Sequence, residues 1–378
     1  MSNHKLTQSV HSGSPGDILH KGLVTPIFPA SAYDYEQVES TRYPRYFNTP
    51  NQRAAASKIA ALENAEGGLL FSSGLAAILT SIFAVMQSGD HAIFQSDLYG
   101  GTFDAILREL PRYGMEYTMV DGSEPANFEQ AIRPETKLIY IETPSNPTLK
   151  ITNVAAVASI ARKHGITSLI DNTFASPVNQ NPIDLGIDIV THSGTKYIGG
   201  HSDLSCGVAV ASKPLIEKIL ARSIHFGGSL DAYSCWLVER SLKTLVLRVR
   251  QQNASAMAIA SALENNPAIG RVYYPGLPSH PDHALAKEQM PGGFGGMLAF
   301  EVKKDPHQFM TNLQLVRRAI SLGGVESTIN SPARTSHIKM SAAEREAIGV
   351  SDNLVRFSTG IEDVDDLIND IQQALGKL

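Results

Sequence analysis

Four short polar segments could carry chemistry, because each directly follows a run of apolar residues. The first is Ser72-Ser73-Gly74-Leu75, which stands where an apolar run passes into a helical pattern. Free backbone N–H groups at a helix N-terminus, next to a hydroxyl and a glycine that allows close approach, bind phosphate well. An ordinary serine N-cap would explain the same residues. By itself, this segment leaves both interpretations open.

A lysine in the second segment could act as a nucleophile. Ser193-Gly194-Thr195-Lys196 follows the apolar run at 187–192. A lysine in such a loop can lose its hydration and become a nucleophilic amine that forms a Schiff base, and the hydroxyls of Ser193 and Thr195 could add phosphate contacts. A solvated surface lysine is the commoner case, but the glycines at 199–200 extend a loop that is too specialised for that role.

The other two segments offer a carboxylate and an amide. Asp171 ends the apolar run at 168–170, and a carboxylate that is partly buried there would need a positive partner. A helix cap or a turn would also suit this residue. Asn146 could reach a ligand ring, but the proline-bounded segment 142–147 is, taken alone, better explained as a turn.

Together, the four segments indicate one cofactor. A phosphate cradle, a lysine that forms an imine and an acid for a heterocyclic nitrogen are what pyridoxal 5'-phosphate (PLP) requires. The acid keeps the ring nitrogen protonated, so that the ring withdraws electrons from a carbanion at the substrate Cα. The sequence therefore predicts that Lys196 and Asp171 lie at a PLP site.

The elements that must position these segments alternate along the chain. From residue 52 onward, short apolar runs are separated by helical patterns, which is typical of a mostly parallel sheet covered on both faces. In such a sheet, ligands bind at the carboxyl ends of the strands, where the four segments lie. Strands are predicted at 69–71, 91–94, 116–120, 138–142, 168–171 and 187–191, and helices at 52–63, 75–87, 102–113, 128–132 and 153–164.

The pattern divides the chain into three parts. Residues 1–51 are rich in proline, tyrosine and serine and are expected to form an extended arm that lies over another surface, such as a second subunit. Residues 52–245 are predicted to form a large cofactor domain. A long amphipathic stretch at 234–265 leads out of it into residues 246–378, a smaller mixed α/β domain. Its predicted strands are 271–274 and 297–302, and its predicted helices are 306–313 and 363–375.

Composition and charge narrow the class of protein. With 378 residues, of which 43% are hydrophobic and 18% charged, the chain is expected to be a well-packed enzyme of two domains. Its net charge of −5 gives no reason to expect nucleic acid or an anionic membrane as a partner, and no apolar stretch is long enough to cross a bilayer. Because the chain has only two cysteines and its N-terminus does not resemble a signal peptide, we expect it to reside in the cytoplasm. We also expect no metal site.

The motifs resemble one known family over nearly the whole length of the chain. Asp-Asn-Thr-Phe-Ala at 171–175 and His-Ser-Gly-Thr-Lys-Tyr at 192–197 are similar to the cofactor signature of the Cys/Met-metabolism (trans-sulfuration) PLP enzymes. Tyr43 and Arg45 in the arm and the segment 354–360 extend the likeness. This family contains cystathionine β-lyases, γ-lyases and γ-synthases, and methionine γ-lyases. The resemblance implies an α/β fold of the aspartate-aminotransferase-like kind, fold type I, with a large doubly wound domain and a small C-terminal domain.

The resemblance also implies roles for individual residues. Lys196 would carry the cofactor and shuttle the Cα proton, Asp171 would pair with the ring nitrogen, and Tyr99 would stack on the ring and serve as an acid–base group. Arginine suits bidentate binding of a carboxylate better than lysine does. The expected phosphate contacts are Ser73, Gly74, Leu75, Ser193 and Thr195, joined by Tyr43 and Arg45 of a neighbouring subunit, and the expected substrate-carboxylate contacts are Asn146, Ser321 and Arg356. A homotetramer built from catalytic dimers is implied.

Two departures from the family pattern bear on the reaction. Gly101 stands where methionine γ-lyases tend to carry a cysteine, and Ile320 stands where many γ-acting members, and some β-lyases, carry a glutamate. We therefore predict a carbon–sulfur lyase that acts on a small sulfur amino acid, by β-elimination of cystathionine or a related thioether. The alternatives are γ-elimination or γ-replacement on the same scaffold and, more remotely, a non-catalytic descendant that only binds.

Overall fold

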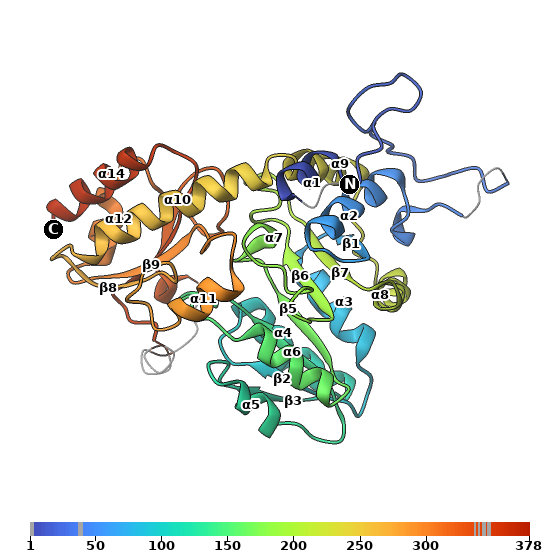
Figure 1. Ribbon diagram of the computed structural model, residues 1–378, viewed down its shortest axis with the longest axis horizontal. Helices are drawn as coiled ribbons and strands as arrows, with labels where there is room; N and C mark the ends of the chain where they lie inside the picture. Colours follow the sequence, from blue (N-terminus) through green and yellow to red (C-terminus); the bar gives the residue numbers. More distant parts are fainter. Residues whose placement is uncertain (1–3, 37–40, 336–337, 339–340, 342–344, 346–348) are drawn as a thin grey trace.

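The chain folds into two sheets, each packed against helices, and one long helix connects them. The computed structural model describes residues 4–36, 41–335, 338, 341, 345 and 349–378. The connecting helix, α10 (Leu245–Glu264), runs between the two bodies (Figure 1). Its first turns pack Leu245 and Val249 into the core of the large sheet, whereas its later turns pack Ile259 and Leu263 into the core of the small one. The boundary we propose at 245/246 falls at the start of this helix.

The large sheet is mostly parallel, as predicted. Its seven strands lie in the order β1-β7-β6-β5-β4-β2-β3, and only β7 runs antiparallel to its neighbours. The sequence did not indicate β7, a short buried strand without polar alternation. The strands are β1 (Gly67–Phe71), β2 (His91–Gln95), β3 (Glu116–Val120), β4 (Thr136–Glu142), β5 (Thr167–Asp171), β6 (Ile189–Ser193) and β7 (Gly207–Ala211).

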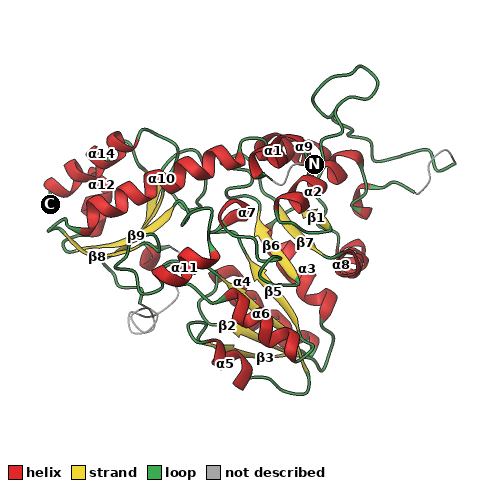
Figure 2. Cartoon of the chain, in the orientation of Figure 1, coloured by secondary structure: helices red, strands yellow, loops and turns green. Residues whose placement is uncertain are grey.

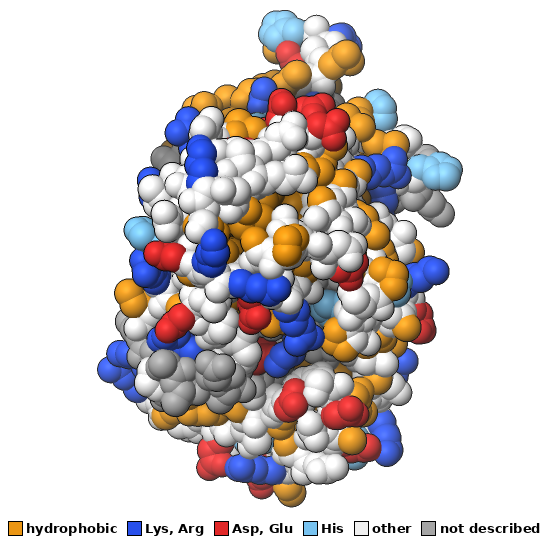
Figure 3. Space-filling view, turned by 90° about the vertical axis from the view of Figure 1, so that its left-hand side faces the viewer, with side chains coloured by type: hydrophobic (Ala, Val, Ile, Leu, Met, Phe, Trp, Pro, Cys, Tyr) orange, Lys and Arg blue, Asp and Glu red, His pale blue; other side chains and the backbone are white. Residues whose placement is uncertain are grey.

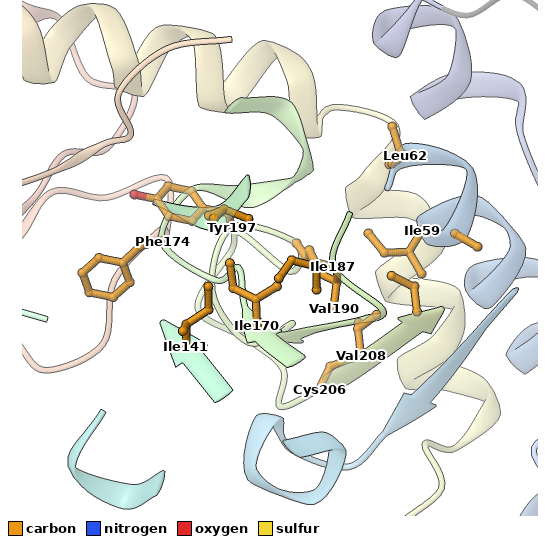
Figure 4. Packing of buried hydrophobic residues seen from close by; sticks show 14 of the residues in the cluster. Ile59, Leu62, Ile141, Ile170, Phe174, Ile187, Val190, Tyr197, Cys206 and Val208 are labelled. Atoms are coloured by element: carbon orange, nitrogen blue, oxygen red, sulfur yellow. The ribbon is translucent and has the colours of Figure 1, made fainter. Parts of the chain in front are cut away.

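Helices cover both faces of this sheet (Figure 2), so the doubly wound fold class is confirmed. Alternate residues along a strand point to opposite faces, which gives two cores. Ile141 and Ile170 face one core, and Ile59 and Leu62 of α2 belong to the same cluster (Figure 4), whereas Tyr140 faces the other core. The first core is covered by α2 (Pro50–Leu62), α5 (Pro125–Gln130), α6 (Val154–Lys163) and α9 (Ala232–Leu242), and the second by α3 (Gly74–Val85), α4 (Gly100–Glu109) and α8 (Lys213–Phe226).

The smaller sheet has five strands in the order β10-β11-β12-β9-β8. Three of its strands, β10 (Arg317–Arg318), β11 (Thr328–Asn330) and β12 (Leu354–Ser358), were not predicted, because short runs give little periodic signal. The other strands are β8 (Ile269–Tyr273) and β9 (Met297–Val302), with α12 (Pro306–Asn312) and α14 (Val364–Gly376) packed on them. The remaining short elements are α7 (Ser176–Asn179), α11 (His283–Gln289), η2 (Leu110–Tyr113) and η3 (Pro332–Arg334).

The N-terminal arm is not extended throughout, so that part of the prediction was wrong. It begins with a short helix, α1 (Lys5–His11), and contains a 3₁₀ turn, η1 (Pro44–Tyr46). The buried amine of Lys58 fixes α1 by donating to the carbonyls of Ser9 and Val10, each at 3.0 Å. Such a tertiary contact leaves no periodic trace in the arm itself. Between these two elements the arm exposes large apolar side chains, namely Ile18, Leu19, Leu23, Val24 and Tyr35.

Within the described part of the chain, no helix combines the length and the apolar character needed to cross a bilayer.

Candidate active site

Polar side chains gather at one edge of the large sheet. The parallel strands β4, β5 and β6 end in Glu142, Asp171 and Ser193, and because the strands run in the same direction, these residues come together at the same edge. The buried apolar residues that precede them force the strands into the core, so that the first polar positions are the strand ends. This is the arrangement that the sequence predicted for the ligand site.

Lys196 lies in the turn that follows β6. Its Nζ donates to Ser321 Oγ at 2.9 Å. Burial lowers the pKa of the Lys196 amine to about 8, with a smaller contribution from the positive charge of Arg356, and the carboxylate of Asp171 opposes both. A lysine with that pKa is neutral in an appreciable fraction of molecules near neutral pH, as a nucleophilic amine must be.

Asp171 is buried at the end of β5. Burial raises the pKa of its carboxyl above the ordinary value, and hydrogen bonds from Thr173 and the electrostatic influence of His192 and Lys196 offset only part of this rise. The Thr173 N–H donates to Oδ1 at 2.9 Å, and its hydroxyl donates to the same atom. One carboxylate oxygen is therefore held by Thr173, and a cationic ring nitrogen would suit the rest of the carboxylate.

Two loops that the sequence treated separately meet to form a cradle of backbone N–H groups. Ser73 caps α3, and its hydroxyl accepts from Ala76 N at 3.2 Å, so the N-cap interpretation is also correct. The N–H groups of Gly74 and Leu75, at the first two positions of the helix, have no intrahelical acceptor. A Cβ on Gly74 would lie 2.8 Å from the Cα of Ser193, so only glycine allows the loops to come this close. The cradle fits a phosphate group.

The hydroxyl of Thr195 is already engaged. It donates to the carbonyl of Cys206 at 3.3 Å and accepts from the Cys206 N–H at 3.0 Å. In this conformation, Thr195 fixes the turn that carries Lys196, and its phosphate role remains a prediction.

Two residues from distant parts of the sequence accept hydrogen bonds from the buried guanidinium of Arg356. Arg356 on β12 donates from Nη1 to Asn146 Oδ1 at 2.9 Å and from Nη2 to the Ser321 carbonyl at 3.2 Å. Its Nε is buried and has no hydrogen-bond partner within the described residues, and burial lowers the pKa of the guanidinium to about 10. Ser321 adopts a φ of +83°, which is unfavourable for residues other than glycine. A buried, incompletely paired arginine suits a carboxylate ligand.

Tyr99 lies at the start of α4 and is half exposed. Its N–H donates to Glu142 Oε2 at 2.8 Å, so the carboxyl of Glu142, at the end of β4, holds the backbone of Tyr99 in place. A Cβ on Gly101 would lie 2.5 Å from the Tyr99 ring, so Gly101 leaves room for the ring. We assigned no role to Glu142 from the sequence, although a carboxyl at the end of an apolar strand was the signal that singled out Asp171.

Tyr43 and Arg45 are not joined to the other site residues. The side chain of Arg45 lies near the rings of Tyr43 and Tyr46 and donates from Nη1 to the Ile224 carbonyl of α8 at 2.6 Å. The arm that carries them projects beside α8, on the outer side of the large sheet (Figure 1).

Comparisons with known proteins agree on one family. The family model described as Cys/Met metabolism PLP-dependent enzyme matches residues 6–376. The chain is 44% identical to the cystathionine gamma-lyase of Bacillus subtilis over 98% of this chain and 99% of that protein. It is 42% identical to the cystathionine beta-lyase of Lactococcus lactis, over 98% of each chain. A crystal structure of cystathionine gamma-lyase from Lactobacillus plantarum, complexed with L-serine, superimposes with a TM-score of 0.94 at 41% identity and covers 99% of this chain and 98% of that one.

Proposed function

We propose that this chain, which belongs to the Cys/Met metabolism PLP-dependent enzymes and is a carbon–sulfur lyase, prefers β-elimination of cystathionine or a related thioether amino acid. The hydrogen bonds of one residue, Ser321, support the assignment of the site most directly. Ser321 accepts from Lys196 through its hydroxyl and from Arg356 through its carbonyl. A lysine amine and an arginine guanidinium held on one residue would place a bound amino acid with its Cα near the amine and its carboxylate on the guanidinium.

The residues that would hold the cofactor follow from the site. Lys196 would bind it covalently, Asp171 would contact its ring nitrogen, and Tyr99 would lie over its ring. Its phosphate would bind the N–H groups of Gly74 and Leu75 together with Ser73, Ser193 and Thr195. When bound, PLP withdraws electrons from the substrate Cα and makes the Cα proton acidic.

The protein side chains would then perform the remaining work. Arg356 and Asn146 bind the substrate carboxylate and orient the Cα–H bond toward Lys196. Once the substrate amino group has displaced it from the cofactor, the Lys196 amine, with a pKa of about 8, would take the Cα proton, after which the bond between Cβ and sulfur would break and the thiolate would leave. Tyr99 would return a proton to the leaving sulfur.

The preference for the β route rests on Ile320. This side chain is 70% exposed and directly precedes Ser321, so it would lie near the substrate without a carboxylate to offer. A γ-elimination needs a second proton taken from Cβ and therefore more acid–base groups around the substrate side chain. Relatives of both names are similarly close, so the comparisons do not decide between the two routes.

An analysis of the keto acid released from cystathionine tests this choice. We expect pyruvate, with homocysteine and ammonia, as the main products. Mainly 2-oxobutyrate, with cysteine and ammonia, would make the enzyme a γ-lyase. Faster formation of cystathionine from cysteine and an O-acylhomoserine would make it a γ-synthase. If neither keto acid forms in protein that carries the cofactor, the chain does not act on cystathionine.

We also propose that the enzyme works as a dimer, which assembles further into a tetramer, and that it resides in the cytoplasm. The arm exposes apolar side chains, and within its own chain Arg45 donates to the Ile224 carbonyl of α8. A neighbouring subunit would bury the arm and receive Tyr43 and Arg45 at its phosphate site.

Positive and negative side chains are interspersed on the face shown in Figure 3, which suits a small-molecule substrate better than a nucleic acid.

Mixing two inactive variants tests this arrangement. Arg45→Ala and Lys196→Ala subunits are each expected to be impaired, but a mixed dimer contains one site with both residues intact. We therefore expect mixing to restore part of the activity, because at most half of the sites in each mixed dimer are intact. If subunit exchange is confirmed by mass and activity stays absent, Arg45 serves its own chain and the proposal fails.

A further inference from the structure

Glu142 lies directly opposite Asp171 on the neighbouring strand. The two residues are register partners in the parallel pair of β4 and β5, and adjacent strands lie about 4.8 Å apart. Along β4, Tyr140 faces the core beneath α3 and α4, and along β5, Leu169 faces the same core. Because side chains alternate, Glu142 and Asp171 point to that face too. Two carboxyl groups are therefore placed side by side at the edge of the sheet.

The surroundings of Glu142 disfavour a second negative charge. The side chain is buried, and the charged groups that act on it most are Asp171 and Asp97, both of which are negative. Burial and these two charges raise the pKa of the Glu142 carboxyl well above its usual range, against the one favourable contact from the Tyr99 N–H. Burial also raises the pKa of the Asp171 carboxyl, but there two hydrogen bonds from Thr173 and the electrostatic influence of His192 and Lys196 oppose the rise.

Hydrogen bonds hold Glu142 in place. Its backbone is fixed to β2 by Gln95, whose Nε2 donates to the Glu142 carbonyl at 2.9 Å and whose Oε1 accepts from the Glu142 N–H at 3.3 Å. The same Gln95 amide donates to the Asp97 carbonyl at 3.2 Å. The Glu142 side chain accepts from the Tyr99 N–H at 2.8 Å. Glu142 thus connects the strand end to the loop that carries Tyr99.

We propose that Glu142 is a positioning residue that stays a neutral carboxylic acid, so that Asp171 alone carries the negative charge of the pair, while Glu142 holds Tyr99 in place through its N–H. Two adjacent buried carboxyls cannot both ionise without a large cost, and the hydrogen bonds and charges around Asp171 decide which of them keeps the proton. This proposal rests on the PLP site proposed above and adds to it a residue that would act through Asp171 and Tyr99.

Infrared difference spectra of the holoenzyme test the protonation state. When the spectrum of Glu142→Gln is subtracted from that of the wild type at pH 7, the band of a protonated carboxyl should remain. Glu129→Gln provides a control, because Glu129 is only partly buried and its hydrogen bonds with Lys163 and His164 lower the pKa of its carboxyl. Its difference spectrum should show the loss of an ionised carboxylate. If Glu142→Gln also removes an ionised carboxylate, the proposal is overturned.

Amide hydrogen exchange tests the contact with Tyr99. Glutamine keeps an acceptor oxygen, whereas leucine does not, so Glu142→Leu should speed exchange in a peptide that contains Tyr99 by about tenfold, as expected for one lost hydrogen bond, and Glu142→Gln should restore most of the protection. In parallel, kcat should fall further in Glu142→Leu than in Glu142→Gln. Equal exchange in all three proteins would refute the positioning role. Neither the spectra nor the exchange depends on the reaction catalysed, so a wrong assignment of the substrate would leave both results interpretable.

Discussion

Replacing Lys196 with alanine is expected to reduce turnover of cystathionine by at least about 10⁴-fold. A positioned acid–base group contributes about 10²–10⁴-fold by itself, and the variant also loses the amine that would bind the cofactor covalently. The Lys196 amine is placed for both tasks by its hydrogen bond to Ser321 and by the burial that lowers its pKa to about 8. The fold should persist, because Lys196 lies in a turn and contributes little to either core.

Keto-acid release and the visible absorbance of the purified protein measure the two losses separately. Lys137→Ala is a suitable control, because Lys137 is exposed on β4 far from its carboxyl end and should retain activity and absorbance. Circular dichroism establishes that each variant is folded. A Lys196→Ala protein with near-normal turnover would contradict the central assignment of the site.

Replacing Asp171 with asparagine should reduce kcat by about 10²- to 10³-fold, which is typical for the loss of one preorganised electrostatic contact. Asparagine preserves the shape of the side chain and can still accept from Thr173, but it removes the charge that would keep the cofactor nitrogen protonated. Without that charge, the ring withdraws electrons less strongly from the substrate Cα. The effect should therefore fall on kcat more than on KM.

Asp188→Asn provides the matched comparison for this prediction. Asp188 accepts from the N–H and the hydroxyl of Ser168 at 2.8 Å and precedes β6, at the opposite edge of the same sheet. Its replacement should cost about 1 kcal/mol of stability, the scale of one weakened hydrogen bond, and leave kcat nearly unchanged. If Asp171→Asn behaved like Asp188→Asn in steady-state kinetics, the role of Asp171 would be structural only.

The sequence by itself determined the scaffold and the polar groups at its edge. Runs of apolar residues such as 138–141 and 168–170 have to be buried, and short buried runs separated by helices pair as parallel strands. A polar residue that ends such a run must then lie at the carboxyl edge of the sheet. Asp171 and Lys196 could be found in this way, because their positions follow from local pattern alone.

Tertiary structure decided which of these groups meet and which are already engaged. Asn146 and Arg356 are 210 residues apart in the sequence, and only the packing of the small sheet against the large one brings them within hydrogen-bond distance. The Thr195 hydroxyl is bonded to Cys206, and Glu142 supports Tyr99 because the register of β4 on β5 places it beside Asp171. Register and packing between elements depend on the fit of whole surfaces, which no local stretch of sequence encodes.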